Sequence, residues 1–437
     1  MNTSFRNPYT IGGWVSGQRY YGHTDLRQYI LLGSDNYIWV IGTRRVGKTS
    51  LLRQLDVQGR KDYLPIYWDM QGCVSADDLR DELVFALEDR APQMQKLGVN
   101  IDALAGDDMA NVLRKLCRQA EKHGVRVLLL IDEPEPLIEI VQKEPRAVQR
   151  LRAAFQRPPN LRVVLTSTKT LASLQEYTRD WPTSPFLTDF APFYLDGLEP
   201  SDAEKLMRQE QRNPVQVTPQ TIRRIHDFTG DHPYLLQWLC YRLYQPDHSL
   251  RPPRKEDIVL DAMLSSLFRL QFDQLSPAER RILLQLVDRG YTAEDVAHAL
   301  DMKPAEAKMY LYVMTRLGFT RPSSSGKITI GNRFLHRWLA EHYTELSVED
   351  AAISDQRVQE MARAGLQEEA VYWQEQLRIY RERLGKLEVT AAKYGDHPPE
   401  RLQATILEHK RRIRTLERKI DAFHKTYGRQ STSRKAF

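Results

Sequence analysis

The sequence predicts an α/β fold, in which a parallel sheet covered by helices is followed by smaller, mainly helical units. Short apolar runs alternate with helix-like segments between residues 37 and 195, as they do in successive βαβ units. The most apolar run, residues 125–131, has the unbroken hydrophobicity of a central strand covered on both faces. A glycine-bounded loop joins the first expected strand to a helix.

We expect these elements to form a first domain over residues 1–198. The strand-length runs are rich in apolar, β-branched and aromatic residues, which favour extended backbone in a sheet. We expect strands at residues 37–41, 64–67, 125–131, 161–166 and 193–195, and helices at residues 48–55, 77–88 and 109–122.

A helical lid is expected over residues 199–250. Ser201 and Glu204 have the spacing of a capping box, and Thr218-Pro219 marks a second helix start. A third helix with an apolar face follows Gly230-Asp-His-Pro233. These three helices would make one small domain.

A winged helix-turn-helix domain is expected over residues 255–345. Ser276 starts the first of three helical segments, and the third covers residues 304–317. A hydrophilic turn at residues 323–326 separates two short strand-like pieces. The junctions near Gly230 and Pro252 are the expected hinges between the domains.

The C-terminal part is periodic and basic. Two heptad stripes separated by a break at residues 395–399 predict an antiparallel coiled-coil hairpin over residues 355–428. Residues 429–437 lack periodicity, and we expect a disordered tail there. The net charge of +6 belongs to residues 355–437, which hold 18 Lys and Arg against 12 Asp and Glu. Two interpretations stay open: a solvated coiled-coil face, or a docking surface for nucleic acid or an acidic protein.

Composition excludes several classes of protein. Apolar residues make up 41% of the 437 residues and charged residues 27%, which is ordinary for a globular chain of more than one domain. No apolar run approaches the roughly 18–20 residues that span a bilayer, and no secretory signal is visible. The three cysteines lie far apart, without metal-ligand spacing. We therefore expect a cytoplasmic protein with no disulfide framework, zinc site or membrane contact.

The loop after the first expected strand carries the clearest chemical signal. Its sequence, GTRRVGKT from Gly42 to Thr49, matches the phosphate-binding P-loop in every required position. Backbone amides of such a loop surround phosphate oxygens, and the helix N-terminus adds its dipole. We expect Lys48 to neutralise the β- and γ-phosphates of ATP, and the hydroxyl of Thr49 to ligate Mg²⁺. The predicted nucleotide-binding residues of this loop are Gly42, Thr43, Arg44, Arg45, Val46, Gly47, Lys48, Thr49 and Ser50. The alternative is a glycine-rich turn that matches by chance.

Two acidic residues follow the most apolar strand. Asp132 and Glu133 stand where a P-loop ATPase carries its Walker B pair. We expect Asp132 to hold Mg²⁺ and Glu133 to act as the catalytic base that polarises the attacking water. The alternative is a pair of acids that simply marks a strand end.

Hydroxyl side chains end the fourth expected strand. Thr166, Ser167 and Thr168 stand there, and one of the three is expected to contact the γ-phosphate or the attacking water. Thr166 and Ser167 are the expected sensor residues. The alternative is an ordinary hydroxyl-rich strand end. An arginine finger cannot be chosen from the sequence, which offers Arg146, Arg150, Arg152, Arg157 and Arg179.

These motifs, with Asn7-Pro-Tyr9, Tyr20-Tyr-Gly-His23 and the phrase FYLDGLEP at residues 193–200, resemble the STAND-type and archaeal-type P-loop ATPases, which are related to the AAA+ class. The resemblance covers roughly residues 5–340. It implies an ASCE-type sheet in the order 5-1-4-3-2, a helical lid and a winged helix. This chain has His23 where the family usually has Arg, and one extra residue between Gly230 and Pro233.

The resemblance also implies contacts to the base and the lid. Tyr21, within the segment from Tyr20 to His23, would lie near the adenine, and His232 or Pro233 would contact the nucleotide from the lid.

The leading functional hypothesis is a regulatory, signal-transduction ATPase whose ATP state sets domain arrangement, assembly or partner binding. A protein partner or self-assembly would use the hairpin at residues 355–428. The alternative is a DNA-associated ATPase that binds DNA through the winged helix and the basic tail. The winged helix favours a packing role, because it offers few basic side chains: Lys308, Arg316, Arg321 and Lys327. A third hypothesis is a scaffold that keeps ATP bound for structure.

Overall fold

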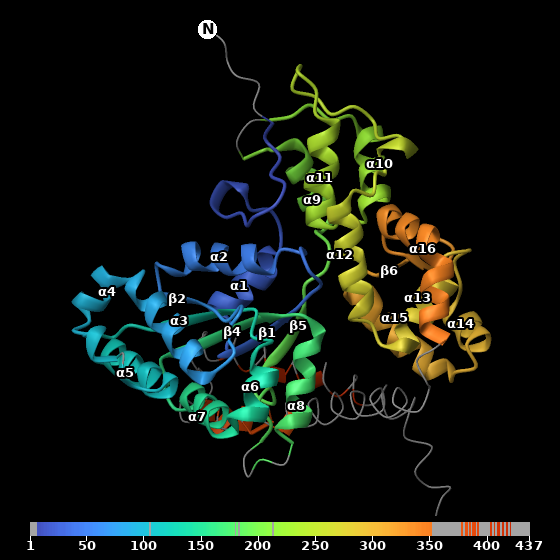
Figure 1. Cartoon of the computed structure of the whole chain (residues 1–437). Coiled ribbons are helices and arrows are strands. Elements are labelled where there is room, and N and C mark those ends of the chain that lie inside the picture. Colours follow the sequence, from blue (N-terminus) through green and yellow to red (C-terminus); the bar gives the residue numbers. More distant parts are fainter. Residues whose placement is uncertain are drawn as a thin grey trace, which may run out of the picture.

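The computed structural model describes residues 7–104, 106–179, 181, 184–211 and 214–351, with scattered positions between 377 and 420. Three units lie side by side (Figure 1): a sheet unit up to Leu198, a lid unit with α9 to α11, and a C-terminal unit with α12 to α16. No helix among the described residues combines the length and apolarity needed to cross a membrane. The predicted disordered tail at residues 429–437 lies outside the described residues, as does most of the predicted hairpin.

The sheet unit contains five parallel strands in the order β2-β3-β4-β1-β5. This order confirms the predicted sheet. The third strand begins two residues later than expected, because the amide of Val125 donates to the carbonyl of Ala120 and still belongs to the end of the preceding helix. The strands are β1 (Tyr37–Ile41), β2 (Leu64–Asp69), β3 (Val127–Asp132), β4 (Leu161–Ser167) and β5 (Ala191–Tyr194).

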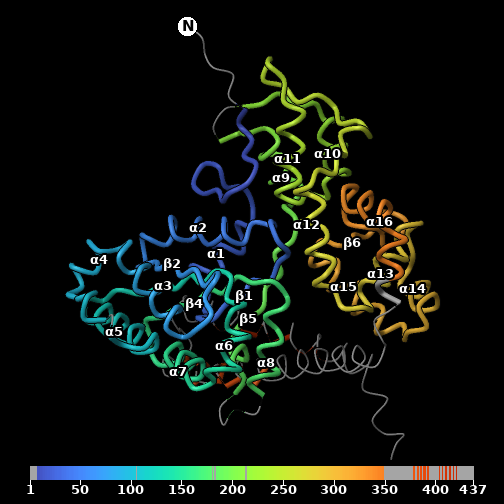
Figure 2. The backbone as a smooth tube through the Cα atoms, viewed as in Figure 1, coloured from blue at the N-terminus to red at the C-terminus, as the bar shows by residue number. Residues whose placement is uncertain are grey.

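Helices cover both faces of this sheet (Figure 2). Every residue of β3 is buried, and its side chains alternate between two cores. Leu128 and Leu130 pack on the α2 side, whereas Leu129 and Ile131 pack on the side of α3, α5 and α7. Each such buried aliphatic side chain contributes about 1.5–3 kcal/mol of hydrophobic free energy. The helices are α1 (Thr24–Leu32), α2 (Lys48–Gly59), α3 (Ala76–Glu88), α4 (Ala91–Lys96), α5 (Met109–Lys122), α6 (Leu137–Lys143), α7 (Pro145–Gln156) and α8 (Leu174–Tyr177), with single turns η1 (Gly17–Arg19), η2 (Asp102–Leu104) and η3 (Lys169–Ser173).

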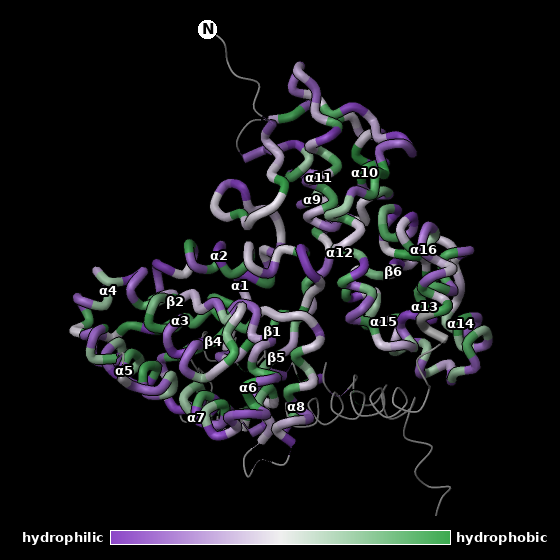
Figure 3. The backbone as a smooth tube through the Cα atoms, viewed as in Figure 1, coloured by the Kyte–Doolittle hydropathy of each residue, from purple (hydrophilic) through white to green (hydrophobic). Residues whose placement is uncertain are grey.

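Hydropathy along α5 follows this packing. Hydrophobic and hydrophilic positions alternate along the helix in Figure 3. Its buried residues, which include Leu113, Leu116 and Cys117, recur at spacings of three and four and make one apolar stripe. Asp108 caps the helix by accepting from the amides of Ala110 and Asn111.

The lid unit contains α9 (Pro200–Arg208), α10 (Pro219–Thr229) and α11 (Pro233–Leu243). The side chain of Thr218 caps α10 by accepting from the amide of Thr221, as expected. The predicted capping box at Ser201 is wrong. Pro200 occupies the first turn of α9, where its fixed φ is favoured, and Glu199 is the N-cap residue, without a side-chain cap bond.

The C-terminal unit contains η4 (Lys255–Asp257), α12 (Ala262–Asp273), α13 (Pro277–Gln285), α14 (Ala293–Ala299), α15 (Pro304–Arg316), β6 (Thr320–Pro322), β7 (Ile328–Ile330) and α16 (Arg333–Ala351). The two strands pair antiparallel. Ser276 and Glu279 form a reciprocal capping box at α13. The sequence pattern did not indicate α12 or α16. The domain boundaries of the lid and the winged helix stay predictions.

The lid and the C-terminal unit share one hydrophobic core. It runs from Ile225 and Trp238 in the lid to Phe334 and Trp338 on α16. The backbones also approach closely, because a Cβ at Gly230 would lie 2.2 Å from the carbonyl oxygen of Gly331. Gly230 ends α10 with a φ of +56°. This contact therefore requires glycine both for its space and for its left-handed backbone.

Candidate nucleotide-binding site

The glycine-bounded loop lies between β1 and α2, at the carboxyl edge of the sheet. The amide of Gly42 donates to the carbonyl of Ser167 over 3.0 Å, which fastens the start of the loop to β4. A Cβ at Gly42 would lie 2.7 Å from Cγ1 of Val46 and 3.0 Å from the carbonyl oxygen of Leu195. A side chain there would displace the loop, so glycine is required for this path of the backbone.

Lys48 is the first residue of α2, and its side chain is buried. Its Nζ donates to the carbonyl oxygens of Gly42 and Thr43, each over 3.1 Å. Burial lowers the pKa of Lys48, and the nearby carboxylates of Glu133 and Glu135 oppose that shift. The ammonium group is therefore held inside the loop, where it can meet an anion with little loss of side-chain entropy.

Asp132 is the last residue of β3, in register with Thr166 of β4. Its Oδ1 accepts from Oγ1 of Thr166 over 2.6 Å, and its Oδ2 accepts from the hydroxyl of Tyr67 over 2.8 Å. Burial and the Asp132 carboxylate raise the pKa of Tyr67, which keeps that hydroxyl protonated as a donor. Each carboxylate oxygen keeps a lone pair for a further donor or a cation.

Glu133 follows β3 with a left-handed backbone, φ +47°, and lines the cavity described below. This conformation is uncommon outside glycine and points to a local constraint at the site. Burial raises the pKa of Glu133, repulsion from Glu135 adds to the rise, and attraction to Lys48 opposes it. A raised pKa makes the carboxylate a stronger base, so Glu133 is suited to accept a proton.

The two predicted sensor residues are both occupied within the sheet. Thr166 donates to Asp132, as described above. Oγ of Ser167 accepts from Nε1 of Trp39 over 2.7 Å and donates to the carbonyl of Thr168 over 2.9 Å.

The sequence interpretation missed Glu135. Its Oε1 accepts from both the amide and the hydroxyl of Thr168. Its position two residues beyond Glu133, in the run Asp-Glu-Pro-Glu, was the available signal.

A cavity of about 900 Å³ opens at this edge of the sheet. We call the lining by residues 44–50 and Glu133 the loop end of the cavity. We call the lining by Trp14, Pro233, Tyr234, Met263 and Leu270, which come from the N-terminal segment, the lid and α12, its distal end. The cavity is lined by these predicted residues: Tyr21, Arg44, Arg45, Val46, Gly47, Lys48, Thr49, Ser50, Glu133 and Pro233. Six predicted residues lie outside its lining: Gly42, Thr43, Asp132, Thr166, Ser167 and His232.

The N-terminal segment runs between the lid and α2 (Figure 2), and its residues Thr10, Trp14 and Val15 line the cavity. On the lid side, the amide of Thr10 donates to Oε1 of Gln237 over 3.0 Å. On the α2 side, the amide of Val15 donates to Oγ of Ser50 over 3.1 Å, and the amide of Gly17 donates to Oε1 of Gln54 over 2.6 Å.

Helix α12 of the C-terminal unit forms the opposite wall. Met263, Leu267 and Leu270 line the cavity from this helix. Nε2 of Gln271 donates to the carbonyl oxygen of Arg44 over 3.1 Å, so α12 is bonded directly to the loop. Sequence reasoning missed this helix altogether.

One contact places a cavity residue of the loop against the lid. The guanidinium of Arg45 lies 4.7 Å from the ring centroid of Tyr234, in a cation–π contact. His23 caps α1 and lines the cavity. Burial lowers the pKa of His23 to about 4 and that of His232 to about 4. Both imidazoles are therefore neutral at pH 7.

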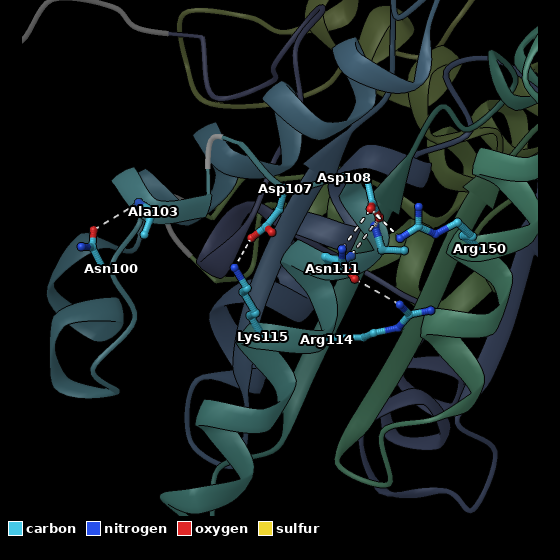
Figure 4. Close-up of polar contacts among 9 residues, drawn as sticks. Asn100, Ala103, Asp107, Asp108, Asn111, Arg114, Lys115 and Arg150 are labelled. Atoms are coloured by element: carbon cyan, nitrogen blue, oxygen red, sulfur yellow. Dashed lines mark hydrogen bonds and ion pairs between the residues drawn. The ribbon is translucent and has the colours of Figure 1, made fainter.

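Two of the arginine-finger candidates have acidic partners within the chain. Arg150 on α7 pairs with Asp108 at the start of α5, with 2.6 Å between nitrogen and oxygen (Figure 4). Arg152 is buried and pairs with Asp189 over 2.8 Å. These two side chains are engaged in holding the sheet unit together.

Comparisons with known proteins agree with this geometry. A family model described as an AAA domain matches residues 32–174. No curated protein matches the sequence. The structure is similar to the Walker-type ATPase PABY2304 of Pyrococcus abyssi, with a TM-score of 0.56 and 15% identity, over 76% of this chain and 99% of that chain. It also matches the Aeropyrum pernix ORC2 protein in its ADPNP-ADP complexes, with a TM-score of 0.44 and 15% identity, over 75% of this chain and 93% of that chain, a likeness too weak to carry an argument. From its sheet order, its loop, the family match over residues 32–174 and the likeness to the Pyrococcus abyssi ATPase, the chain has the α/β fold of the P-loop ATPases.

Proposed function

We propose that this protein binds and hydrolyses ATP with Mg²⁺, and that its nucleotide state sets how the C-terminal unit sits on the sheet unit. The observation that carries the proposal is the single cavity that joins the P-loop and Glu133 to the lid and α12. A ligand in this cavity would touch all three units. Its binding would therefore favour whichever arrangement gives it the most contacts.

The residues at the loop end fit a magnesium–nucleotide complex. Lys48 supplies a buried cation for the phosphates, and the hydroxyl of Thr49 and the carboxylate of Asp132 are oxygen ligands of the kind that Mg²⁺ accepts directly or through water. Magnesium, when bound, neutralises charge that develops on the phosphate oxygens. Glu133 would take a proton from the attacking water, and Asp132 would stay oriented by Thr166 and Tyr67.

Charge pairing in the C-terminal unit supports a regulatory role over DNA binding. Lys308 pairs with Glu294 over 2.8 Å, Arg316 approaches Asp196 at 3.6 Å, and Arg321 pairs with Asp227 over 3.0 Å. Three of the four basic residues that the winged helix offers for DNA binding are thus close to acidic residues of the same chain. Two of these acidic residues, Asp196 and Asp227, belong to the sheet unit and the lid unit. Basic groups that already hold units together are poorly placed to contact phosphates of DNA.

The decisive experiment compares the wild-type protein with Lys48→Ala. We expect the variant to lose binding of a fluorescent ATP analogue and to lose ATP hydrolysis, while its circular dichroism spectrum is unchanged. Small-angle scattering of the wild type, with and without Mg²⁺ and the analogue, would report the change in arrangement. Hydrolysis that survives Lys48→Ala would refute the site.

A DNA-associated ATPase remains the second candidate, because residues 401–437 hold 11 Lys and Arg against 3 Asp and Glu. Binding of duplex DNA would weaken steeply with salt and with neutralisation of Lys410, Arg411 and Arg412. No binding at low salt would remove this candidate.

The predicted hairpin at residues 355–428 is also the proposed surface for a protein partner or for self-assembly. At its described positions, Arg381 pairs with Glu417 over 2.7 Å and Lys410 pairs with Glu388 over 2.8 Å. From the first pair to the second, the residue number rises from 381 to 388 on one side and falls from 417 to 410 on the other. This pattern supports the proposed antiparallel hairpin.

A further inference from the structure

Glu135 clamps the end of β4 to the loop that follows β3. Its Oε1 accepts from the amide of Thr168 over 2.7 Å and from the hydroxyl of Thr168 over 2.8 Å. Thr168 is only 3% exposed. Two donors of Thr168 thus share one carboxyl oxygen of Glu135. Movement of the acidic loop would therefore be passed to Thr168.

The second oxygen of Glu135 has different surroundings. Oε2 is buried, and among the described residues it has no hydrogen-bond partner. A buried carboxylate oxygen without a donor costs free energy, so a state that supplies a donor is favoured over one that does not. The charge of Glu135 is also felt by Lys48 and Glu133, where it acts to raise both pKa values. Glu135 therefore stands within electrostatic reach of the loop end of the cavity.

Lys169, the residue after Thr168, crosses to the C-terminal unit. Its ammonium group forms an ion pair with Oε2 of Glu279 on α13. The same oxygen accepts from the amide of Ser276 over 2.7 Å and from its hydroxyl over 2.9 Å. Glu279 is only 4% exposed. The N-terminal cap of α13 is thus completed by a lysine from the edge of the sheet.

We propose that Glu135, Thr168, Lys169 and Glu279 form a polar relay that couples magnesium–nucleotide binding at the P-loop to the docking of α13. The relay deepens the proposed function and rests on it. Water bound to magnesium is a donor of the kind that Oε2 of Glu135 lacks. A donor there would stabilise the clamp on Thr168 and hold Lys169 toward Glu279. Because coupling between two sites is reciprocal, docking of α13 would in turn tighten nucleotide binding.

The first test measures affinity for a fluorescent ATP analogue with Mg²⁺ in the full-length protein. Lys169→Met should weaken binding by about fivefold or more, the lower end of typical coupling between sites. The matched control is Lys308→Met, which removes an ion pair with Glu294 that stays within the C-terminal unit. The control should stay within about twofold of the wild type, as for other exposed ion pairs. Unchanged or tighter binding by Lys169→Met would overturn the relay.

A double-mutant cycle tests whether the residues act as one unit. In a Glu135→Gln background, Lys169→Met should change the affinity by less than about twofold, because the connection is already broken. Effects that multiply would show two independent sites and would overturn the relay. Should Lys169→Met fail to fold, Glu279→Gln carries the same expectation, since its amide oxygen can still accept from Ser276.

Hydrogen exchange distinguishes a relay from a merely structural ion pair. In the wild type, the magnesium–nucleotide complex should slow exchange of the amides at residues 278–285, and in Glu135→Gln it should not. A nucleotide-dependent change that persists in Glu135→Gln would overturn the relay. Failure of the wild type to bind nucleotide would instead refute the proposed function, so the two failures can be told apart.

Discussion

The two ends of the cavity are built in different ways. At the loop end, Lys48 is the first residue of α2 and Glu133 follows the fully buried strand β3. At the distal end, the wall comes from the N-terminal segment, the lid and α12, which contribute Trp14, Pro233 and Met263. The loop end is held by hydrogen-bonded neighbouring strands, β1, β3 and β4. The distal end exists only while three separate units are packed together.

This difference implies a division of labour between chemistry and regulation. Charged groups that act on phosphates belong where backbone register fixes them, because small displacements there cost much of the rate. Apolar groups that lie on separate units tolerate displacement, so they suit the part of a site that opens and closes. Four variants or conditions would break or sharpen this contrast.

The largest effect is expected for Glu133→Gln at the loop end. Removing the general base should lower kcat for ATP hydrolysis by about 10²–10⁴-fold and leave affinity for the ATP analogue nearly unchanged. Single-turnover hydrolysis and equilibrium titration would separate the two quantities. Equal loss of affinity and of kcat would mean that Glu133 holds the ligand and does not act in the chemical step.

Gly230→Ala should break the packing that supports the distal end. The added methyl group would lie 2.2 Å from the carbonyl oxygen of Gly331, on a backbone with φ +56°. Strain and overpacking together should lower the free energy of unfolding by about 2–4 kcal/mol. Urea denaturation would measure it.

The matched control is Gly124→Ala. Gly124 also has a positive φ, +68°, but a Cβ there would meet nothing within 4 Å. Gly124→Ala should lower the free energy of unfolding only through backbone strain, by about 1–2 kcal/mol. Equal losses in the two variants would show that the contact between the lid and the C-terminal unit contributes nothing.

Met263→Ala should have a modest effect at the distal end. The side chain is 45% exposed and lines the cavity. Its partial burial by a ligand should make the variant bind the ATP analogue about two- to fivefold more weakly, with kcat unchanged. Tyr312→Ala, an exposed residue on α15 outside the lining, is the control. A loss as large as that of Lys48→Ala would contradict the division between the two ends.

The pH dependence should show the smallest effect. The raised pKa of Glu133 means that its carboxyl becomes protonated at a higher pH than an ordinary glutamate, whose pKa is about 4.3. As the pH falls, kcat should therefore decline with a midpoint above that value. Glu135→Gln removes a like charge and should move the midpoint downward. An unmoved midpoint would show that Glu135 does not act on Glu133.

The same contrast separates what the sequence could predict from what it could not. The strands, the P-loop and the acidic pair follow from short-range patterns, in which a strand, a loop and a helix are consecutive, whereas the order of the strands in the sheet was implied by the family resemblance. The wall formed by α12 does not, because Gln271 and Arg44 are 227 residues apart and no periodicity links them. The clamp of Glu135 on Thr168 was missed for a similar reason, since it depends on β3 and β4 being neighbours in the sheet.

The bond from Gln271 to Arg44 has a consequence for comparing relatives of this chain. Its acceptor is a main-chain carbonyl, which every residue type carries. Position 44 can therefore change its side chain freely without breaking the bond, and no pairwise pattern of substitutions between positions 44 and 271 should arise. The contact of the C-terminal unit with the loop therefore depends on the backbone path of the loop and not on its side chains. Superposing structures would reveal this connection, whereas aligning sequences would miss it.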